Sequence, residues 1–423
     1  MSFETISVIG LGYIGLPTAA MFAAYGKNVI GVDVNQNAVD TINRGEIHIV
    51  EPDLDAIVHK AVTDGKLKAV LTPEPADAFL IAVPTPFLPS ENIDDIPQPD
   101  LKYIQSAAKA IAPVLKNGDL VILESTSPVG ATEKMAEWLA EYRSDLTFPK
   151  THGEKSDVRI AHCPERVLPG HIVRELVEND RVIGGLTAKC SEHAVELYKA
   201  FVKGDCVVTN ARTAEMAKLT ENSCRDVQIA FANELSIICD KLDIDVWELI
   251  SLANRHPRIN ILQPGPGVGG HCIAVDPWFI VSKTPEQAQL IHTARKINDT
   301  KPLWVIDKVK VAIAEFLQAN PDKTVKDITV ACYGLAFKPD IDDLRESPAV
   351  SLVQQLADLH AGRVLSVEPN IQFLPTNITN TELVNFENAA KEADIHLMLV
   401  DHKEFKSTKL NLEYLIDTKG VWS

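Results

Sequence analysis

The sequence predicts an α/β protein with two Rossmann-like doubly wound domains, joined by a helical central domain that contains a long connecting helix. Two observations support this prediction. Short β-branched runs alternate with helical patterns in the first half of the chain and again after Pro321, which is typical of a parallel sheet covered by helices on both faces. Between these parts, residues 211–242 have long helical periodicity and contain neither Gly nor Pro. We therefore expect domains at residues 1–209, 210–318 and 319–423.

The first elements of the chain are expected to form a βαβ unit. Residues 5–10 (TISVIG) are a predicted strand, the helical pattern LPTAAMFAAYG follows a glycine-containing turn, and residues 28–33 (NVIGVD) are the next predicted strand. Further strands of the same parallel sheet are expected at residues 78–83, 120–124 and 181–184.

A proline-rich segment, residues 84–99, interrupts this pattern. It is too rich in proline for a strand or a helix, and Asp94, Asp95 and Asp100 lie in or directly after it. We interpret this segment as a loop over a site.

The helical middle contains a second long stretch, residues 287–317, which we expect to break near Pro302. Long helices between two sheet regions often carry a dimer contact, so a homodimer is expected. The elements expected after the middle are strands at residues 328–332, 364–367 and 395–400 and a helix at residues 347–358.

The composition excludes several classes of function. The chain has 423 residues, of which 46% are hydrophobic and 23% are charged, as in a globular protein. Its 41 Lys and Arg against 58 Asp and Glu give a net charge of −17, which repels nucleic acid and anionic membranes. A negatively charged small substrate stays compatible, because a local pocket can oppose the global charge.

The cysteines and the absence of a recognisable targeting segment concern the compartment. Seven cysteines without tight spacing are not a disulfide framework and suit a reducing compartment. No basic n-region precedes residues 5–10, and no apolar run is long enough to span a bilayer. We expect a cytoplasmic protein.

The first motif is a glycine triplet, Gly10, Gly12 and Gly15, between a predicted strand and helix. Gly10 permits a tight turn, Gly12 allows the backbone to approach a pyrophosphate, and Gly15 allows close packing of helix and strand. Asp33 closes the next strand, where its carboxylate can accept hydrogen bonds from ribose hydroxyls and repel a 2′-phosphate. The motif therefore predicts NAD as cofactor; the alternative is a plain glycine turn.

The second motif is PGPGVGGHC, residues 264–272, which leads to Asp276. Four glycines within six residues remove side chains from the loop, so a ligand can lie against its backbone. Cys272 ends the loop, and a thiolate there can act as a nucleophile. The alternative is that Cys272 is a small buried apolar residue, as most unpaired cysteines are.

Two further groups are cationic. Lys218, Asn222 and Arg225 are spaced to lie on one helix face, which suits an anionic ligand, although a solvated helix face has the same pattern. Lys338 and Arg345 follow the strand at residues 328–332, where ligands bind in open α/β sheets, and they could neutralise a diphosphate. The alternative for Arg345 is an ordinary surface ion pair with the neighbouring aspartates.

Zinc is the one metal that the sequence brings into question. His162-Cys163 and His271-Cys272 are adjacent His-Cys pairs, but their separation matches no standard ligand spacing and no Cys-x-x-Cys occurs. We expect no metal site.

Seven motifs in order along nearly the whole chain resemble the UDP-sugar 6-dehydrogenases, the UDP-glucose/GDP-mannose dehydrogenase family. They are GLGYIGLP, VPTP, STSPVG, CPER, AEMAKLTEN, GPGVGGHC and AFKPD. The segment NRHPRIN (residues 254–260), followed by PGVGGHCIAVDPW, resembles the members that act on UDP-N-acetyl-D-mannosamine. UDP-glucose enzymes typically have Ser where this chain has His271.

The resemblance implies a four-electron oxidation of the sugar C6 hydroxyl to a uronate, with hydride passed to NAD twice. Lys218 resembles the family's acid/base, and Cys272 matches the nucleophile that forms a thiohemiacetal and then a thioester. Glu165 and Asp276 resemble the carboxylates that position or activate the hydrolytic water, and Asn222 would hold the oxyanion. The product would serve surface polysaccharide biosynthesis.

The resemblance also implies ligand contacts. For NAD, it places Tyr13 and Ile14 beside the pyrophosphate, Asp33 on the ribose, and Thr85 and Thr126 near the nicotinamide. Some sugar-nucleotide contacts, such as Arg258, are candidates to cross a dimer interface. The implied sugar-nucleotide contacts are Arg166, Val167, Lys218, Asn222, Arg225, His256, Arg258, Gly269, Phe337, Lys338, Arg345 and Lys419.

Three alternative functions stay open at this point. The first is the same chemistry on UDP-glucose or UDP-N-acetylglucosamine. The second is a two-electron β-hydroxyacid dehydrogenase, which shares the first domain and a helical lysine but needs neither Cys272 nor the third domain. The third is a catalytically silent nucleotide-binding regulator, although such a protein would show a broken set of catalytic residues, and this set is present.

Overall fold

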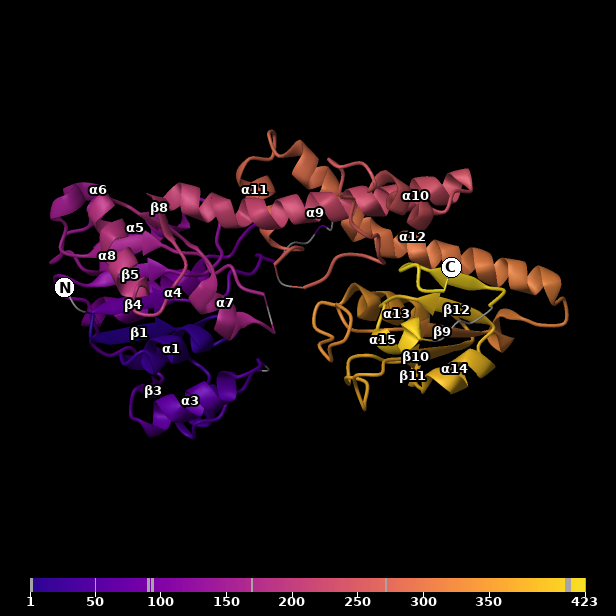
Figure 1. Ribbon diagram of the computed structural model, residues 1–423, viewed down its shortest axis with the longest axis horizontal. Helices are drawn as coiled ribbons and strands as arrows, with labels where there is room; N and C mark the ends of the chain where they lie inside the picture. Colours follow the sequence, from indigo (N-terminus) through magenta and orange to yellow (C-terminus); the bar gives the residue numbers. More distant parts are fainter. Residues whose placement is uncertain are drawn as a thin grey trace. The chain divides into compact units, whose positions relative to one another are not determined.

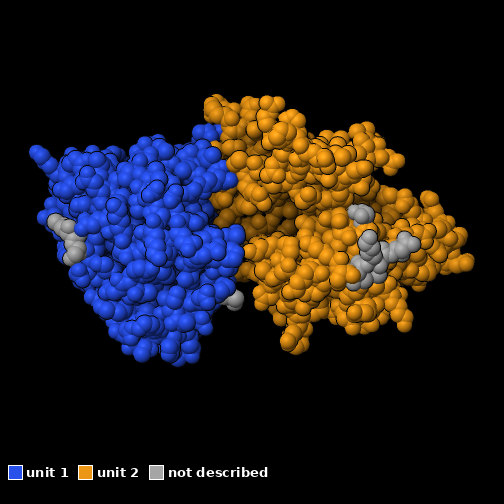
Figure 2. Space-filling view, in the orientation of Figure 1, with its two compact units in different colours: residues 1–221, 282–284 blue, residues 222–281, 285–423 orange. Residues whose placement is uncertain are grey.

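The computed structural model describes residues 3–49, 51–89, 92, 95–168, 170–270, 272–407 and 412–422. Asp94 of the predicted loop and His271 of the glycine-rich motif lie outside the described residues. The chain forms two compact units, coloured separately in Figure 2. Unit 1 comprises Met1–Glu221 and Ser282–Thr284, and unit 2 comprises Asn222–Val281 and Pro285–Ser423.

Unit 1 is built on an eight-stranded sheet with the strand order β3-β2-β1-β4-β5-β6-β7-β8. The first six strands in this order are parallel, which is the arrangement of a dinucleotide-binding fold. The strands are β1 (Thr5–Ile9), β2 (Asn28–Val32), β3 (Leu67–Val70), β4 (Ala78–Ile81), β5 (Leu120–Leu123), β6 (Arg159–His162), β7 (Arg181–Gly185) and β8 (Cys206–Asn210).

The helices of unit 1 cover both faces of this sheet (Figure 1). Residues of α1, α2, α3, α7 and α8 share a core with Ile6 and Val8 of β1, whereas α4 and α5 pack on the opposite face with Ile9. The helices are α1 (Gly15–Ala24), α2 (Gln36–Asn43), α3 (Leu54–Thr63), α4 (Lys102–Ile111), α5 (Ala131–Tyr142), α6 (Pro149–His152), α7 (Ile172–Glu178) and α8 (Ala188–Tyr198), with 3-10 turns at Ala112–Val114 and Gly153–Lys155.

The direction of β7 differs from the prediction. This strand was expected in a parallel sheet, but β7 is antiparallel to β6 and is followed by β8, which is parallel to β7. An apolar strand pattern fits either direction, because the direction depends on the connections and not on the side chains. The predicted α/β class is nevertheless confirmed.

Unit 2 contains a five-stranded, fully parallel sheet with the order β11-β10-β9-β12-β13. Helices α12 and α13 share a core with Val330 on one face, and α14 and α15 share a core with Tyr333 on the other. The elements are β9 (Thr329–Tyr333), α13 (Pro348–Leu359), β10 (Arg363–Val367), β11 (Glu382–Leu383), α14 (Phe386–Glu392), β12 (Ile395–Met398), α15 (Lys403–Lys406) and β13 (Leu415–Asp417).

Helices dominate the middle of the chain. The predicted connecting helix is α9, which begins in unit 1 and ends in unit 2. No helix within the described ranges has both the length and the apolar composition needed to cross a bilayer. The elements are α9 (Ala211–Leu242), α10 (Val246–Ala253), α11 (Asp276–Lys283), α12 (Gln289–Ala319) and a 3-10 turn at Val325–Asp327.

The predicted break near Pro302 is wrong, because α12 continues through this residue. Pro302 removes one backbone hydrogen bond from the helix. Lys301 and Val305, which flank it, are buried at 2% and 0% exposure, so packing on both sides holds the helical backbone. The ring of Pro302 also lies where Gly267 leaves room, since a Cβ on Gly267 would be 3.2 Å from Cγ of Pro302.

The proline-rich segment has the irregular structure that its sequence predicts. Its described residues contain no helix or strand, and the isolated antiparallel bridge between Phe87 and Pro99 closes it. Its role as a loop over a site stays a prediction.

Candidate active site

The glycine turn after β1 combines tight packing with one open side. Gly10 has a φ of +91°, and a Cβ on it would lie 2.6 Å from the carbonyl oxygen of Ala82. A Cβ on Gly15 would overlap the carbonyl oxygen of Gly10. A Cβ on Gly12 would meet no described atom within 4 Å, so the turn is open to a ligand at this position. Packing thus requires Gly10 and Gly15, and ligand access explains Gly12.

The N-terminus of α1 follows this turn and suits an anion. Ile14 is the N-cap residue but makes no side-chain cap hydrogen bond, and over this fully described helix the first turn has no acidic residue. Backbone N–H groups and the positive end of the helix dipole therefore face the open side of the turn, as in pyrophosphate sites. Tyr13 is half-buried and packs against the core of unit 1.

Asp33 lies directly after β2 with a fixed orientation. Leu11 N–H donates to Oδ2 at 2.9 Å, and Asn35 N–H donates to Oδ1 at 2.9 Å. These bonds hold the carboxylate beside the glycine turn, and each oxygen keeps a lone pair for a ribose hydroxyl. The carboxylate therefore fits the ribose position of a dinucleotide that has no 2′-phosphate.

Two buried hydroxyl groups follow the next strands of the sheet. Thr85 Oγ1 and Ser127 Oγ are buried, and neither has a hydrogen-bond partner among the described residues. Buried hydroxyl groups are normally hydrogen-bonded, so an unpaired one at the carboxyl end of a strand is a candidate for binding a ligand. Thr85 and the half-buried Thr126 were predicted as cofactor contacts, but Ser127 was not. The burial of Ser127 and the missing partner of its hydroxyl group arise only in the folded chain, so nothing in the sequence singles out this residue.

Glu165 and Arg166 lie after β6, and their side chains have different partners. Glu165 is 6% exposed; Arg166 N–H donates to its Oε1 at 2.7 Å, and Arg181 Nη1 donates to its Oε2 at 2.6 Å. The guanidinium of Arg166 instead forms an ion pair with Glu221, with Nη2 at 2.6 Å from Oε1. Val167 packs against the core of unit 1.

Lys218 lies on the part of α9 that belongs to unit 1 and is 9% exposed. One turn before it, the Glu215 carboxylate accepts hydrogen bonds from Gly130 N–H at 2.7 Å and from Thr132 N–H and Oγ1–H at 2.8 and 2.7 Å. These donors cap the N-terminus of α5, while burial raises the pKa of the Glu215 carboxyl. The start of α9, and with it Lys218, is therefore anchored on the sheet domain.

The structure brings Asn222, Asp276 and Cys272 together within unit 2. Asn222 Nδ2 donates to Asp276 Oδ2 at 2.5 Å. Asp276 is 3% exposed, and its N–H donates to the carbonyl oxygen of Cys272 at 2.9 Å. Cys272 itself is exposed, as a reactive thiol must be. It is therefore not the small buried apolar residue that the sequence left open as an alternative.

The glycine-rich loop before Cys272 is held at several points. Asn233 Oδ1 accepts a hydrogen bond from Gly265 N–H at 2.9 Å, and Gly270 N–H donates to the carbonyl oxygen of Glu346 at 3.2 Å. A Cβ on Gly269 would overlap that same oxygen, and a Cβ on Gly267 would be 3.0 Å from Cβ of Pro348. The loop therefore packs against the turn before α13, which larger residues would push away.

The predicted contacts from the carboxy-terminal part partly surround this loop. A Cβ on Gly270 would be 4.0 Å from the Phe337 ring, and a Cβ on Gly265 would be 3.6 Å from Lys419 Nζ. Lys338 is half-buried, and its Nζ lies 5.8 Å from the centroid of the Phe337 ring. Arg345 forms a bidentate pair with Asp343, the surface arrangement that the sequence left open.

Three predicted contacts are solvent-exposed in the chain. Arg225 lies on α9, and His256 and Arg258 lie in the turn that follows α10. Arg258 N–H donates to His256 Nδ1 at 3.3 Å, so this turn is locally ordered.

One cluster in unit 2 has the residue types of a metal site. Ligand atoms of Asp340, His402 and Glu404 lie within 4.8 Å of one another. However, Asp340 N–H donates to His402 Nδ1 at 2.9 Å, and His402 Nε2 therefore donates to Glu368 at 3.0 Å. Both ring nitrogens are engaged, which opposes metal ligation. Glu368 also accepts from Leu335 N–H at 2.7 Å, so the cluster anchors the loop that carries Phe337.

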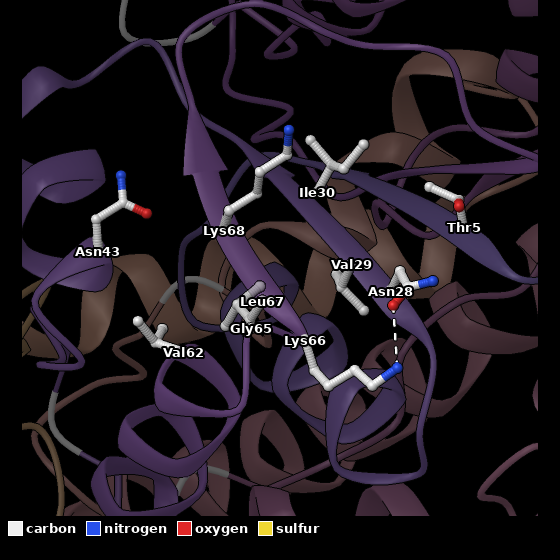
Figure 3. A pocket seen from close by; sticks show the side chains of 10 residues that line it. All are labelled: Thr5, Asn28, Val29, Ile30, Asn43, Val62, Gly65, Lys66, Leu67 and Lys68. Atoms are coloured by element: carbon white, nitrogen blue, oxygen red, sulfur yellow. Dashed lines mark hydrogen bonds between the residues drawn. The ribbon is translucent and has the colours of Figure 1, made fainter.

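A cavity of unit 1 lies away from these residues. A cavity of about 490 Å³ lies at the amino ends of β1, β2 and β3, beside Thr5, Asn28 and Leu67 (Figure 3). Lys66, which also lines the cavity, donates a hydrogen bond from Nζ to Asn28 Oδ1 at 3.1 Å (Figure 3). The glycine turn lies at the opposite ends of these strands, so this cavity is separate from the predicted cofactor site.

The chain matches the UDP-glucose/GDP-mannose dehydrogenase family over three segments. They are the NAD binding domain (residues 4–202), the central domain (residues 212–300) and the UDP binding domain (residues 331–423). Over the full length of both chains it is 65% identical to a UDP-N-acetyl-D-mannosamine dehydrogenase of Yersinia pestis.

Two further comparisons extend this result. An NDP-N-acetyl-D-galactosaminuronic acid dehydrogenase of Ralstonia nicotianae is 62% identical over 100% of this chain and 97% of its own. The structure of a UDP-D-ManNAc dehydrogenase of Pyrococcus horikoshii superimposes with a TM-score of 0.85 at 37% identity, covering 99% of this chain and 96% of that chain.

Proposed function

Because this chain belongs to the UDP-glucose/GDP-mannose dehydrogenase family and carries its NAD binding domain, we propose that it oxidises UDP-N-acetyl-D-mannosamine to UDP-N-acetyl-D-mannosaminuronate. The observation that supports the reaction type is the exposed thiol of Cys272 close to a polar pair. Asp276 N–H donates to the carbonyl oxygen of Cys272, and the Asp276 carboxylate accepts a hydrogen bond from Asn222. The observation that carries the sugar is the full-length identity of 65%.

The amino-terminal residues bind and orient the cofactor. The open turn at Gly12 and the N-terminus of α1 bind the pyrophosphate, and Asp33 binds the ribose. Thr85 and Ser127 supply hydroxyl groups on the nicotinamide side. When bound, NAD accepts one hydride in each of the two oxidations.

The first oxidation needs a base for the C6 hydroxyl proton. Lys218 takes this proton, and the neutral amine becomes an ammonium as the alcohol becomes an aldehyde. Asn222 donates a hydrogen bond to the oxygen on which negative charge develops. Proton removal by Lys218 and hydride loss from C6 together account for the two electrons and two hydrogens that leave the substrate.

Cys272 carries the second oxidation. Its thiol adds to the aldehyde carbon, with the S–C bond formed and the thiol proton passed to the carbonyl oxygen, which gives a thiohemiacetal. Loss of a second hydride and of the hydroxyl proton gives a thioester. Water then adds to the thioester carbon, the C–S bond breaks with its electron pair on sulfur, and one water proton restores the thiol. Glu165 and Asp276 accept hydrogen bonds from this water.

The experiment is a count of NADH formed per sugar consumed, with UDP-N-acetylmannosamine, UDP-N-acetylgalactosamine, UDP-N-acetylglucosamine and UDP-glucose tested side by side. Two NADH from the mannosamine sugar alone support the proposal. Two NADH from the galactosamine sugar would instead favour the same oxidation of a UDP-N-acetylgalactosamine substrate, which the 62% identity to the Ralstonia nicotianae enzyme makes the second candidate function. One NADH per sugar would contradict the thioester route.

An exposed apolar face of α9 suggests how the chain assembles. Phe231, Ile238 and Leu242 are exposed by 51%, 45% and 62% along one side of α9, and an apolar helix face of this kind suits a second copy of the chain. A homodimer is therefore proposed, with Arg258 as a residue that reaches the partner's site. Light scattering tests it: a dimer is expected for the parent, and a monomer for Phe231→Glu.

Two further parts of the proposal concern domains and compartment. We divide the chain at residues 1–209, 210–318 and 319–423; the family segments, at residues 4–202, 212–300 and 331–423, support this division. Seven cysteines, all described and none in a disulfide, support a reducing compartment, the cytoplasm. Limited proteolysis at the two proposed boundaries tests the division.

A further inference from the structure

We propose that Arg181 is a positioning residue for thioester hydrolysis, acting through the Glu165 carboxylate. This inference rests on the proposed function, in which Glu165 accepts a hydrogen bond from the hydrolytic water. Arg181 begins β7, the strand that runs antiparallel to β6, and no motif in the sequence marks it. Its side chain nevertheless contacts Glu165 directly.

The contact between the two residues is short and buried. Arg181 Nη1 lies 2.6 Å from Glu165 Oε2, and the two side chains are 3% and 6% exposed. Arg166 N–H occupies the other oxygen of Glu165 at 2.7 Å. Charge-assisted hydrogen bonds of this length are strong where water is excluded, so the orientation of the Glu165 side chain is fixed.

Arg181 is also held by Tyr198 and Glu124. Its guanidinium lies 4.9 Å from the centroid of the Tyr198 ring, and Nη1 lies 3.8 Å from Glu124 Oε1. Tyr198 OH donates to that same Glu124 oxygen at 2.7 Å. The contacts with Tyr198 and Glu124 therefore help to hold the guanidinium of Arg181 in place, in addition to its hydrogen bond to Glu165.

The guanidinium of Arg181 lies near two buried carboxyl groups, those of Glu124 and Glu165. Glu124 is fully buried, and this burial raises the pKa of its carboxyl to about 7. Arg181 Nη1 is 2.6 Å from the Glu165 carboxylate but 3.8 Å from that of Glu124, so its direct hydrogen bond goes to Glu165.

This arrangement predicts which chemical step depends on Arg181. In hydrolysis, the water oxygen bonds to the thioester carbon, the C–S electron pair moves to the sulfur of Cys272, and one water proton reaches that sulfur. Glu165 holds the water during this attack, and the hydrogen bond from Arg181 keeps the Glu165 side chain in the required orientation. The two earlier hydride losses do not involve this water, so they do not need Arg181.

The test is single-turnover and steady-state kinetics of Arg181→Lys, combined with the intact mass of the protein during turnover. With UDP-N-acetylmannosamine and excess NAD, the first turnover should still release two NADH per active site. Steady-state turnover should fall about 10- to 100-fold, and a sugar-nucleotide adduct should accumulate on Cys272. Equal slowing of both phases without an adduct overturns the proposal, because a merely structural role slows every step.

Two variants complete the design. Arg159 on β6 is also a buried arginine, at 8% exposure, and donates to Ser156 and not to Glu165, so Arg159→Lys should keep both phases and show no adduct. If Arg181→Lys does not fold, Tyr198→Phe decides, since it removes only the hydroxyl that fixes Glu124. An adduct in Tyr198→Phe supports the proposal, and none overturns it.

Glu165→Gln separates this inference from the proposed function. If Glu165→Gln accumulates the adduct and Arg181→Lys does not, only the role of Arg181 is wrong. If Glu165→Gln forms acid at the parent rate, the hydrolytic role of Glu165 itself is wrong, and the role of Arg181 is overturned with it.

Discussion

Asn222 and Asp276 are 54 residues apart in the chain, and their side chains are joined by a 2.5 Å hydrogen bond from Nδ2 to Oδ2. The bond connects α9 to the first residue of α11. Asp276 N–H in turn donates to the carbonyl oxygen of Cys272, so the amide of Asn222 fixes the carboxylate that lies nearest to the nucleophile along the chain. Removal of the Asn222 amide should therefore lower the reaction rate more than the stability of the fold.

For Asn222→Ala, we expect kcat to fall about 100-fold, because a preorganised hydrogen-bond donor is lost near the reacting carbon. Asn222→Asp should be more impaired, since it places a second carboxylate against Asp276. Initial rates of NADH formation at saturating UDP-sugar measure both effects. A kcat within twofold of the parent for Asn222→Ala would contradict the proposed role.

For Cys272→Ala, we expect no uronate, because no thiohemiacetal can form without the thiol. The first oxidation and its reversal with an added aldehyde should persist, because Lys218 is untouched. Product analysis by mass spectrometry distinguishes acid from aldehyde. Cys224→Ala is the matched control, since Cys224 is also exposed and lies on α9, and it should form acid at the parent rate.

For Asp33→Ala, we expect the KM for NAD to rise about 10-fold or more and the preference for NAD over NADP to weaken. The substitution removes the ribose acceptor and the negative charge that repels a 2′-phosphate. Steady-state kinetics with both cofactors measure the change. Asp40→Ala on α2 serves as control, because Asp40 is exposed and its side chain contacts only Gln36 in the recorded hydrogen bonds.

A prediction about pH concerns Lys301, whose burial lowers the pKa of its ammonium group to about 7. The unfolded chain holds this proton up to about pH 10.5, so between pH 7 and 9 the unfolded state binds more protons than the folded state. Stability should therefore rise with pH in this window, by about 2 kcal/mol from this group.

Lys301→Met should remove that part of the dependence. Thermal midpoints at pH 7 and pH 9 measure it: the parent should gain several degrees more than the variant between the two values. Lys310→Met is the control, because Lys310 lies on the same helix with its side chain 59% exposed. Identical pH profiles for the parent and Lys301→Met would show that Lys301 is not the responsible group.

The sequence predicted those parts of the site that depend on spacing along the chain. The glycine triplet with Asp33, and Cys272 after its glycine loop, could be read because their chemistry follows from residue type and local order. The fold class followed from alternation, but the direction of β7 did not, because its apolar pattern is compatible with either direction.

Residues whose proposed roles depend on contacts distant in sequence were not predicted. Arg181 lies 16 residues from Glu165 and has no motif around it, and Ser127 differs from its neighbour Thr126 in being fully buried, with an unpaired hydroxyl group. Pro302 shows the opposite error, because a local helix breaker was overridden by the burial of its neighbours. The burial of a side chain and the identity of its hydrogen-bond partners are set by the fold, so they could not be predicted from the sequence alone.

The unequal surroundings of the three glycines in the first turn have a practical consequence. A methyl group at Gly10 or Gly15 would strike the backbone, whereas a methyl group at Gly12 would occupy space that only a ligand needs. A library of variants sorted by cellular abundance would therefore lose substitutions at the first and third glycines and retain Gly12→Ala. The same library sorted by catalytic output would lose all three, so the difference between the two sorted pools isolates cofactor binding from folding at one residue.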